Sequence, residues 1–129
     1  MTIIGMGLDA ADIPRIARML DRYGDRFIRR VFTDGEIAYC SRKVHAAESY
    51  AARFAAKEAA MKALGTGHAL GVLWRDVEVV RLGGPPQLEF HGAAVGRFTH
   101  MGGASAHLTL THTRDLALAH VILLGATGR

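Results

Sequence analysis

Two acidic residues in the first half of the chain, Asp9 and Glu58, occupy positions where a carboxylate would need a cation or a hydrogen-bonding partner. At helical spacing, Glu58 falls on one stripe with Tyr50, Phe54 and Met61, on a face that should pack against the rest of the protein. A lone ionised carboxylate on such a face carries a large desolvation cost. A bound cation would remove that cost, and so would a structural ion pair or a stripe edge that reaches water. The spacing leaves all three explanations open.

Asp9 raises the same question. It ends the apolar segment 3–9, which reads as a strand with Gly5 and Gly7 on the same face as the aspartate. Glycine within a strand often marks the close approach of a ligand or of another backbone. An aspartate at this strand end could bind a hard cation, or it could serve as a turn or capping residue. Asp9 and Glu58 lie far apart in the sequence, and no local metal motif links them.

Basic residues surround Glu58 in the sequence. Arg53 and Lys57 form an i,i+4 pair on one flank, and Lys62 follows Glu58 by one helical turn on the other. Carboxylates that hold Mg²⁺, combined with cations that hold phosphate oxygens, suit a metal-bound polyphosphate. Ordinary solvated charge on a helix surface is the alternative explanation for each of these cations.

A second basic feature follows the first strand. Five arginines recur at spacings of three or four residues, as on one helical face: Arg15, Arg18, Arg22, Arg26 and Arg29. Such a face favours an acidic partner, although interspersed aspartates leave a solvated face with local ion pairs as the alternative. A nucleic-acid surface would interleave aromatic residues with the cations, and few aromatic residues lie near this stripe. We therefore expect an acidic protein partner and no nucleic acid.

The composition limits the class of protein. The 129 residues are expected to form a single domain, 1–129, because half of them are hydrophobic and the net charge is a modest +4. The single cysteine, Cys40, excludes an internal disulfide and a multi-cysteine zinc site. The histidines show no H-x-x-x-H zinc spacing. With no secretory leader and no membrane-spanning apolar run, a soluble cytoplasmic protein is expected.

The order of expected elements is typical of the α+β class. Asp12 is placed to cap a first helix that has Pro14 in its first turn, and Thr33 with Glu36 has capping-box spacing for a second. The remaining expected elements are a long alanine-rich helix over 46–64, strands over 74–82 and 87–91, a short helix over 92–101, and a hairpin of 107–113 with 116–124. We predict a mostly antiparallel sheet that packs against the long helix.

Two further residues have structural explanations on the sequence alone. Gly65 follows the last helical residue and is well placed to end the long helix. His112 shares strand parity with Leu108 and Leu110, which favours a core histidine over a catalyst.

The segment 48–67, ESYAARFAAKEAAMKALGTG, resembles the signature of the holo-acyl-carrier-protein synthases, which are small phosphopantetheinyl transferases. The opening IIGMGLDAADIPRI is similar to the start of that family, where an aspartate follows a glycine-rich strand. FTDGEIAYC, WRDVEVV and the terminal LTLTHTRDLALAHVI match in place and order, and the resemblance therefore covers essentially the whole chain. It implies the phosphopantetheinyl transferase fold.

The resemblance also assigns roles to residues of this sequence. It implies that Asp9 and Glu58 bind Mg²⁺ and that Lys62 contacts a coenzyme A phosphate. The other coenzyme A-binding positions that it implies are Arg53, Gly65 and His112. Because the first helix of the family docks the acidic carrier protein, the implied contacts are Arg15, Arg18 and Arg22. A homotrimer with active sites between subunits is implied as well.

The implied reaction is attack by a carrier-protein serine on the coenzyme A phosphorus that bears pantetheine, with adenosine 3′,5′-bisphosphate as the leaving product. Glu58 is our hypothesis for the base that takes the serine proton, directly or through a metal-bound water. Lys62 would add electrostatic stabilisation. The alternative function is a non-catalytic module that binds the carrier protein through the arginine stripe.

Overall fold

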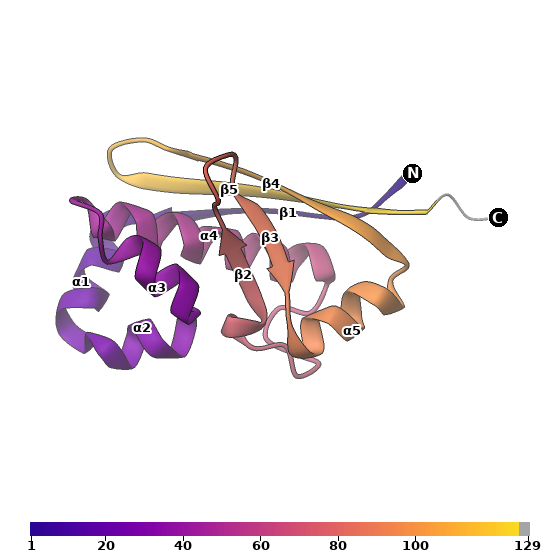
Figure 1. Ribbon diagram of the computed structural model, residues 1–129, viewed down its shortest axis with the longest axis horizontal. Helices are drawn as coiled ribbons and strands as arrows, with labels where there is room; N and C mark the ends of the chain where they lie inside the picture. Colours follow the sequence, from indigo (N-terminus) through magenta and orange to yellow (C-terminus); the bar gives the residue numbers. More distant parts are fainter. Residues whose placement is uncertain (127–129) are drawn as a thin grey trace.

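The computed structural model describes residues 1–126 of the chain (Figure 1). The elements in chain order are β1 (Thr2–Asp12), α1 (Ile13–Tyr23), α2 (Asp25–Val31), α3 (Asp34–Cys40), α4 (Ala46–Leu64), a 3₁₀ turn (Trp74–Asp76), β2 (Val77–Val80), β3 (Gln87–Phe90), α5 (Gly92–His100), β4 (Gly103–His112) and β5 (Leu116–Gly125). The strands form a three-stranded antiparallel sheet in the order β1-β5-β4 and a separate antiparallel pair, β2-β3. The predicted α+β class is confirmed.

The long helix α4 lies directly against the three-stranded sheet. A Cβ atom added at Gly7 would stand 1.8 Å from the carbonyl oxygen of Ala59, and one at Gly5 would stand 2.2 Å from that of Ala63. The two glycines therefore mark the close approach of another backbone, that of α4, rather than of a ligand. Small residues on both elements make this contact possible.

The other sides of α4 are covered too. Figure 1 shows α1, α2 and α3 gathered at one end of the molecule, and β2, β3 and α5 beside the other end of α4. Most α4 side chains are consequently buried, including Tyr50, Met61 and Leu64. A helix buried on nearly all sides lacks the single apolar stripe of a surface helix, and a stripe drawn from spacing alone misplaces some of its residues.

The basic segment after β1 is two helices rather than one. α1 ends at Tyr23, and Gly24 adopts a positive φ of 52° that breaks the helical path before α2 begins at Asp25. The break lets Phe27 and Val31 turn into the core. The expected stripe of five arginines on one helix is therefore wrong: Arg15, Arg18 and Arg22 lie on α1, and the other two lie on α2.

Several local predictions are confirmed by the backbone. Asp12 caps α1 through the backbone N–H of Arg15, and Thr33 and Glu36 form the capping box of α3. The last hairpin is longer than expected because β4 begins at Gly103. The strand expected from residue 74 begins at Val77, after the 3₁₀ turn. Within residues 1–126, no helix combines the length and the apolar character needed to cross a membrane.

Candidate active site

The strand residue Asp9 lies beside the last turns of α4. The ammonium of Lys62 donates to Asp9 Oδ1 at 2.8 Å and to the carbonyl oxygen of Leu8 at 3.2 Å. The Asp9 side chain is 18% exposed and the Lys62 side chain is 53% exposed. The hydrogen bond from Lys62 to Asp9, helped by the negative charges of Asp9 and Glu58, raises the pKa of Lys62. A carboxylate and a fully charged lysine thus meet where β1 crosses α4.

Glu58 precedes Lys62 by one turn of α4. It borders a hollow of about 220 Å³ between β1, α1 and α4, which we call the Glu58 hollow; its other lining residues are Ala10, Ala11, Asp12, Arg15, Ile16, Met19 and Phe54. The Glu58 side chain is 27% exposed and stands at the edge of the packed surface. Of the explanations that the spacing left open, a stripe edge that reaches water agrees with this exposure, and the carboxylate is accessible to a ligand.

An imidazole that the sequence reasoning missed stands next to Glu58. His68 Nε2 lies 3.8 Å from Glu58 Oε1, and the His68 ring packs on Trp74 with a centroid distance of 4.4 Å. Trp74 in turn stacks on Phe54 at 5.0 Å. His68 lies in the loop after α4 and Trp74 begins the short 3₁₀ turn, and no periodic pattern there indicates which side chains return to the helix.

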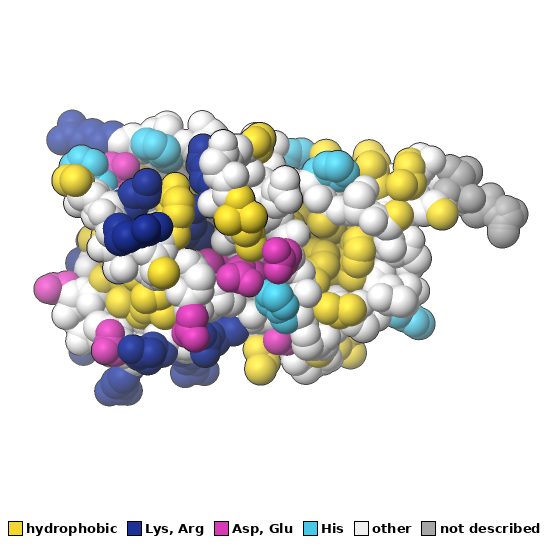
Figure 2. All heavy atoms as spheres, in the orientation of Figure 1, with side chains coloured by type: hydrophobic (Ala, Val, Ile, Leu, Met, Phe, Trp, Pro, Cys, Tyr) yellow, Lys and Arg dark blue, Asp and Glu magenta, His cyan; other side chains and the backbone are white. Residues whose placement is uncertain are grey.

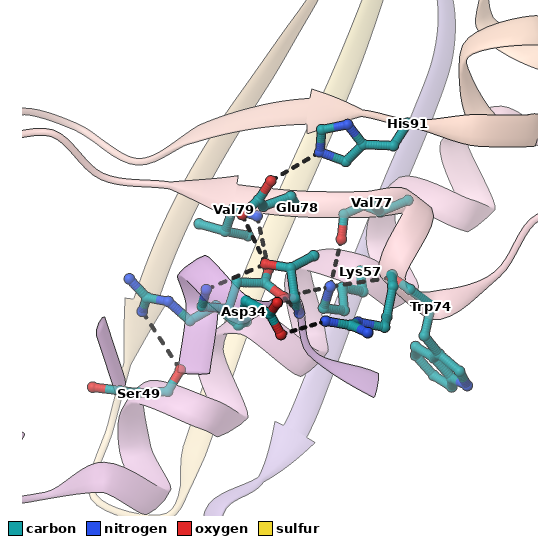
Figure 3. A network of polar contacts seen from close by, with 12 residues as sticks. Asp34, Ser49, Lys57, Trp74, Val77, Glu78, Val79 and His91 are labelled. Atoms are coloured by element: carbon teal, nitrogen blue, oxygen red, sulfur yellow. Dashed lines mark hydrogen bonds and ion pairs between the residues drawn. The ribbon is translucent and has the colours of Figure 1, made fainter. Parts of the chain in front are cut away.

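Lys57 does not belong to this site. Its ammonium forms an ion pair with Glu36 Oε1 at 2.7 Å, and both side chains are 0% exposed (Figure 3). The same ammonium donates to the carbonyl oxygens of Trp74 and Val77. Burial lowers the pKa of Lys57, and the charge of Glu36 opposes that effect. The expectation that Lys57 holds phosphate is wrong, because this lysine ties α4 to α3 and β2.

Arg53 and His112 come together in a second hollow, of about 210 Å³, which we call the Arg53 hollow. Arg53 is 4% exposed; its guanidinium carbon lies 4.2 Å from the centre of the Tyr39 ring, and its Nη1 donates weakly to the Ser49 carbonyl oxygen at 3.5 Å. Among the described residues, its Nε has no hydrogen-bond partner. A buried donor without a partner suits the binding of an anion.

Two further lining residues of the Arg53 hollow were not found from the sequence. They are Tyr39 and Arg81. Burial by itself would raise the pKa of the Tyr39 hydroxyl, but the positive charges of Arg53, Lys43 and Arg81 lower it overall. Two arginines, Arg53 and Arg81, and one glutamate, Glu48, line the hollow. His112 has the predicted parity with Leu108 and Leu110, but it is exposed at the end of β4, and the expectation of a core histidine is wrong.

Gly65 ends α4 in the left-handed conformation, with φ of 72°, as predicted for a helix cap. Its N–H donates to the Lys62 carbonyl oxygen at 3.0 Å. The neighbouring Leu64 carbonyl accepts a 2.7 Å hydrogen bond from Arg97 Nε on α5. This turn fixes the end of the helix that carries Glu58 and Lys62.

The α1 arginines form an exposed face beside the Glu58 hollow. Arg15, Arg18 and Arg22 border one shallow depression together with Met19 and Tyr23. Arg15 and Met19 also line the Glu58 hollow. Figure 2 shows Lys and Arg side chains concentrated over the helical end of the molecule. The basic face is thus continuous with the carboxylate site.

Comparisons with known proteins give one consistent result. The family model for the 4′-phosphopantetheinyl transferase superfamily matches residues 5–119. Proteins named holo-[acyl-carrier-protein] synthase from Koribacter versatilis and Solibacter usitatus are each 52% identical over 122 residues, which is 94% of this chain and 98% of theirs.

Solved structures of the same name have the same fold. The Neisseria meningitidis synthase has a TM-score of 0.87 at 29% identity and covers 95% of this chain and 99% of its own. The Bacillus anthracis synthase, solved in complex with CoA (3′,5′-ADP), has a TM-score of 0.79 at 32% identity over 98% of this chain and all of its own. The resemblance read from the sequence is confirmed, and the chain belongs to the holo-[acyl-carrier-protein] synthase family of the 4′-phosphopantetheinyl transferase superfamily.

Proposed function

We propose that this protein transfers the 4′-phosphopantetheine group of coenzyme A to a serine of an apo acyl carrier protein. The observation that carries the proposal is the meeting of Asp9, Glu58 and Lys62 beside the exposed arginine face of α1, in a chain of this family. Relatives solved with coenzyme A support the co-substrate, and the names of the curated relatives support the transferase rather than a non-catalytic binding module.

Asp9 and Glu58 fit the binding of Mg²⁺. Both offer carboxylate oxygens, the donors that this ion prefers, and both are partly exposed. When bound there, the ion would neutralise negative charge on the pyrophosphate of coenzyme A. Lys62 would then turn from Asp9 to a phosphate oxygen, because its half-exposed side chain is free to change rotamer and its raised pKa keeps it charged.

Different side chains of this protein carry out the separate parts of the transfer reaction. The serine hydroxyl of the carrier protein attacks the phosphorus that bears pantetheine, and the bond from that phosphorus to the bridging oxygen breaks. Glu58 accepts the serine proton, because its carboxylate borders the hollow between α4 and the docking helix. Lys62 stabilises the charge that develops on the phosphates. Adenosine 3′,5′-bisphosphate leaves.

The carrier protein docks on α1 through Arg15, Arg18 and Arg22. These side chains are exposed and border one depression, and a basic surface of this kind attracts an acidic partner over distances of about a Debye length, ~10 Å at 0.1 M salt. Because Arg15 also lines the Glu58 hollow, a serine presented by a protein on α1 would face Glu58.

The Arg53 hollow supplies a second part of the coenzyme A site, and a homotrimer would bring the two parts together. The Arg53 and Glu58 hollows have no described lining residue in common. The outer face of the three-stranded sheet exposes Met6 (56%) and Leu8 (62%), next in register to Ile122 and His120 of β5. Exposed apolar surface of this kind suits association between protomers.

The proposed activity is tested by intact-mass spectrometry of apo acyl carrier proteins incubated with this protein, coenzyme A and Mg²⁺. A mass gain of one phosphopantetheine group that EDTA abolishes is the expected result. If the folded protein binds the carrier proteins but no mass gain follows, the binding module is the correct function. Cytoplasmic location and a role in supplying fatty-acid synthesis remain predictions.

A further inference from the structure

A group of three metal-ligating side chains stands on the small sheet β2-β3, away from the residues proposed for catalysis. Glu78 of β2 lies directly opposite Glu89 of β3 in the antiparallel register. His91 follows Glu89 by two residues, which places it on the same face. His91 Nε2 is 2.8 Å from Glu78 Oε1 and 4.0 Å from Glu89 Oε1, and the three ligand atoms lie within 4.8 Å of one another.

The imidazole thus stands between two carboxylates. The charge of Lys57 also acts on Glu78, but that ammonium is already paired with Glu36. In the part of the chain that the structure describes, neither Glu78 nor Glu89 forms an ion pair with lysine or arginine. Like charges directly opposite each other in an antiparallel pair destabilise it. A divalent cation would offset this repulsion and would use all three groups as ligands.

Glu78 is held in place from the side opposite His91. Its Oε2 accepts a 2.7 Å hydrogen bond from the Thr33 hydroxyl, which also caps α3 (Figure 3). Gly35 leaves the space for this carboxylate, since a Cβ there would stand 2.7 Å from Glu78 Oε2. Burial acts to raise the Glu78 pKa, but the Thr33 and His91 hydrogen bonds lower it overall, and the carboxylate stays ionised. Outer hydrogen bonds of this kind orient metal ligands.

The chemical types of the three side chains favour Zn²⁺ over Mg²⁺. One imidazole nitrogen with two carboxylate oxygens suits Zn²⁺, whereas Mg²⁺ prefers oxygen ligands alone. Two ligands at ordinary zinc distances in a tetrahedron lie about 3.4 Å apart, between the 2.8 Å and 4.0 Å found from His91 to the two carboxylates. The Glu89 and His91 side chains are 58% and 44% exposed and can make the small adjustment.

We propose that Glu78, Glu89 and His91 form a zinc site with one coordination position left for water. The proposal is independent of the transferase activity. Zinc there would join β2 to β3, and a two-stranded sheet has little stability of its own. Because a ligand that binds the folded state stabilises it, zinc should raise the melting temperature.

The test is calorimetric titration of the EDTA-stripped full chain with ZnCl₂, with Mg²⁺ present, and a melting curve with and without zinc. The ligand variants are Glu89→Gln and His91→Gln, both at exposed side chains. His107→Gln is the matched control, since His107 is exposed on β4 and contacts Ser105. A double variant, Asp9→Asn with Glu58→Gln, removes the two carboxylates proposed to bind Mg²⁺ and tests whether zinc binds there instead.

We expect the wild-type chain to bind one zinc ion and to melt at a higher temperature with zinc. Each ligand variant should bind zinc at least tenfold more weakly. The His107→Gln control and the Asp9/Glu58 double variant should bind zinc as the wild type does. Circular dichroism of each variant without metal separates loss of the site from loss of fold. The proposal is overturned if wild type does not bind zinc, if either folded ligand variant binds within tenfold of wild type, or if the Asp9/Glu58 double variant loses the binding.

Discussion

The ammonium of Lys57 lies 2.7 Å from Glu36 Oε1 at a point where neither side chain reaches solvent. Glu36 also accepts the backbone N–H of Val79 at 2.8 Å through its other oxygen. The pair therefore joins α3, α4 and β2 immediately beside Glu58, the residue that follows Lys57. Lys57 and Glu58 are therefore adjacent in sequence, but the Lys57 side chain is buried in an ion pair whereas the Glu58 carboxylate is partly exposed.

Replacing Lys57 with methionine should leave the Glu36 carboxylate buried without its cation. Breaking a buried pair in this way costs about 3–5 kcal/mol, so the free energy of unfolding in urea should fall by that order. Replacing both residues, as Lys57→Met with Glu36→Gln, removes the buried charge and keeps a side-chain oxygen that can accept a backbone N–H, so it should be less harmful than Lys57→Met alone. Equal stability of wild type and Lys57→Met would show that the pair contributes nothing.

Gly7→Ala should destabilise the protein through the contact between β1 and α4. The new methyl group would stand 1.8 Å from the Ala59 carbonyl oxygen, and such overpacking typically costs about 1–3 kcal/mol or more. Gly96→Ala is the matched control, because Gly96 lies within α5 with no atom near its added Cβ; it should stabilise by about 0.5–1 kcal/mol. Chemical denaturation of both variants checks the prediction, and it fails if Gly7→Ala unfolds at the wild-type midpoint.

The thiol of Cys40 predicts a pH dependence at the alkaline end. Burial raises the pKa of this thiol from 9.0 to about 11. Above pH 9 the unfolded chain loses the thiol proton while the folded chain keeps it, and the contribution of Cys40 to stability is therefore lost as the pH rises from 9 to 11. Cys40→Ala should show a flatter decline over this range. Parallel declines in urea denaturation at pH 8, 9 and 10 would contradict this.

Charge reversal on α1 should weaken recognition of the carrier protein. Arg15→Glu and Arg18→Glu are each expected to raise the KM for the carrier protein at least ~10-fold, with a smaller effect at high salt. Arg29→Glu makes the same change of charge on α2, beyond the break at Gly24, and should leave that KM nearly unchanged. A similar rise for Arg29→Glu would place the docking surface across both helices.

Much of the local structure could be predicted because its causes are local. The capping box of Thr33 and Glu36, the cap at Gly65 and the last hairpin depend on residues a few positions apart. The prediction of one arginine stripe was wrong because the arginine spacing continues past Gly24 whereas the helix does not. The chain turns at Gly24, and Phe27 thereby reaches the core.

The rest depended on contacts between distant segments. The burial of Lys57 follows from the covering of α4 by α3 and β2, which no pattern within α4 reveals. His68 returns to Glu58 from a loop, and Tyr39 and Arg81 reach the Arg53 hollow from separate elements. The register that opposes Glu78 and Glu89 is set across a loop whose length is not fixed by the sequence pattern.

The most direct test of the proposed catalytic site is the rate of phosphopantetheine transfer by Glu58→Gln at saturating Mg²⁺, coenzyme A and apo carrier protein. The carrier-protein mass reports the product, and Glu89→Gln, which removes an exposed carboxylate on β3, serves as the control. Loss of a general base typically costs about 10²–10⁴-fold in rate, and we expect a loss of that order for Glu58→Gln, with a wild-type rate for Glu89→Gln. Full turnover by Glu58→Gln would contradict the assignment of Glu58 as the base.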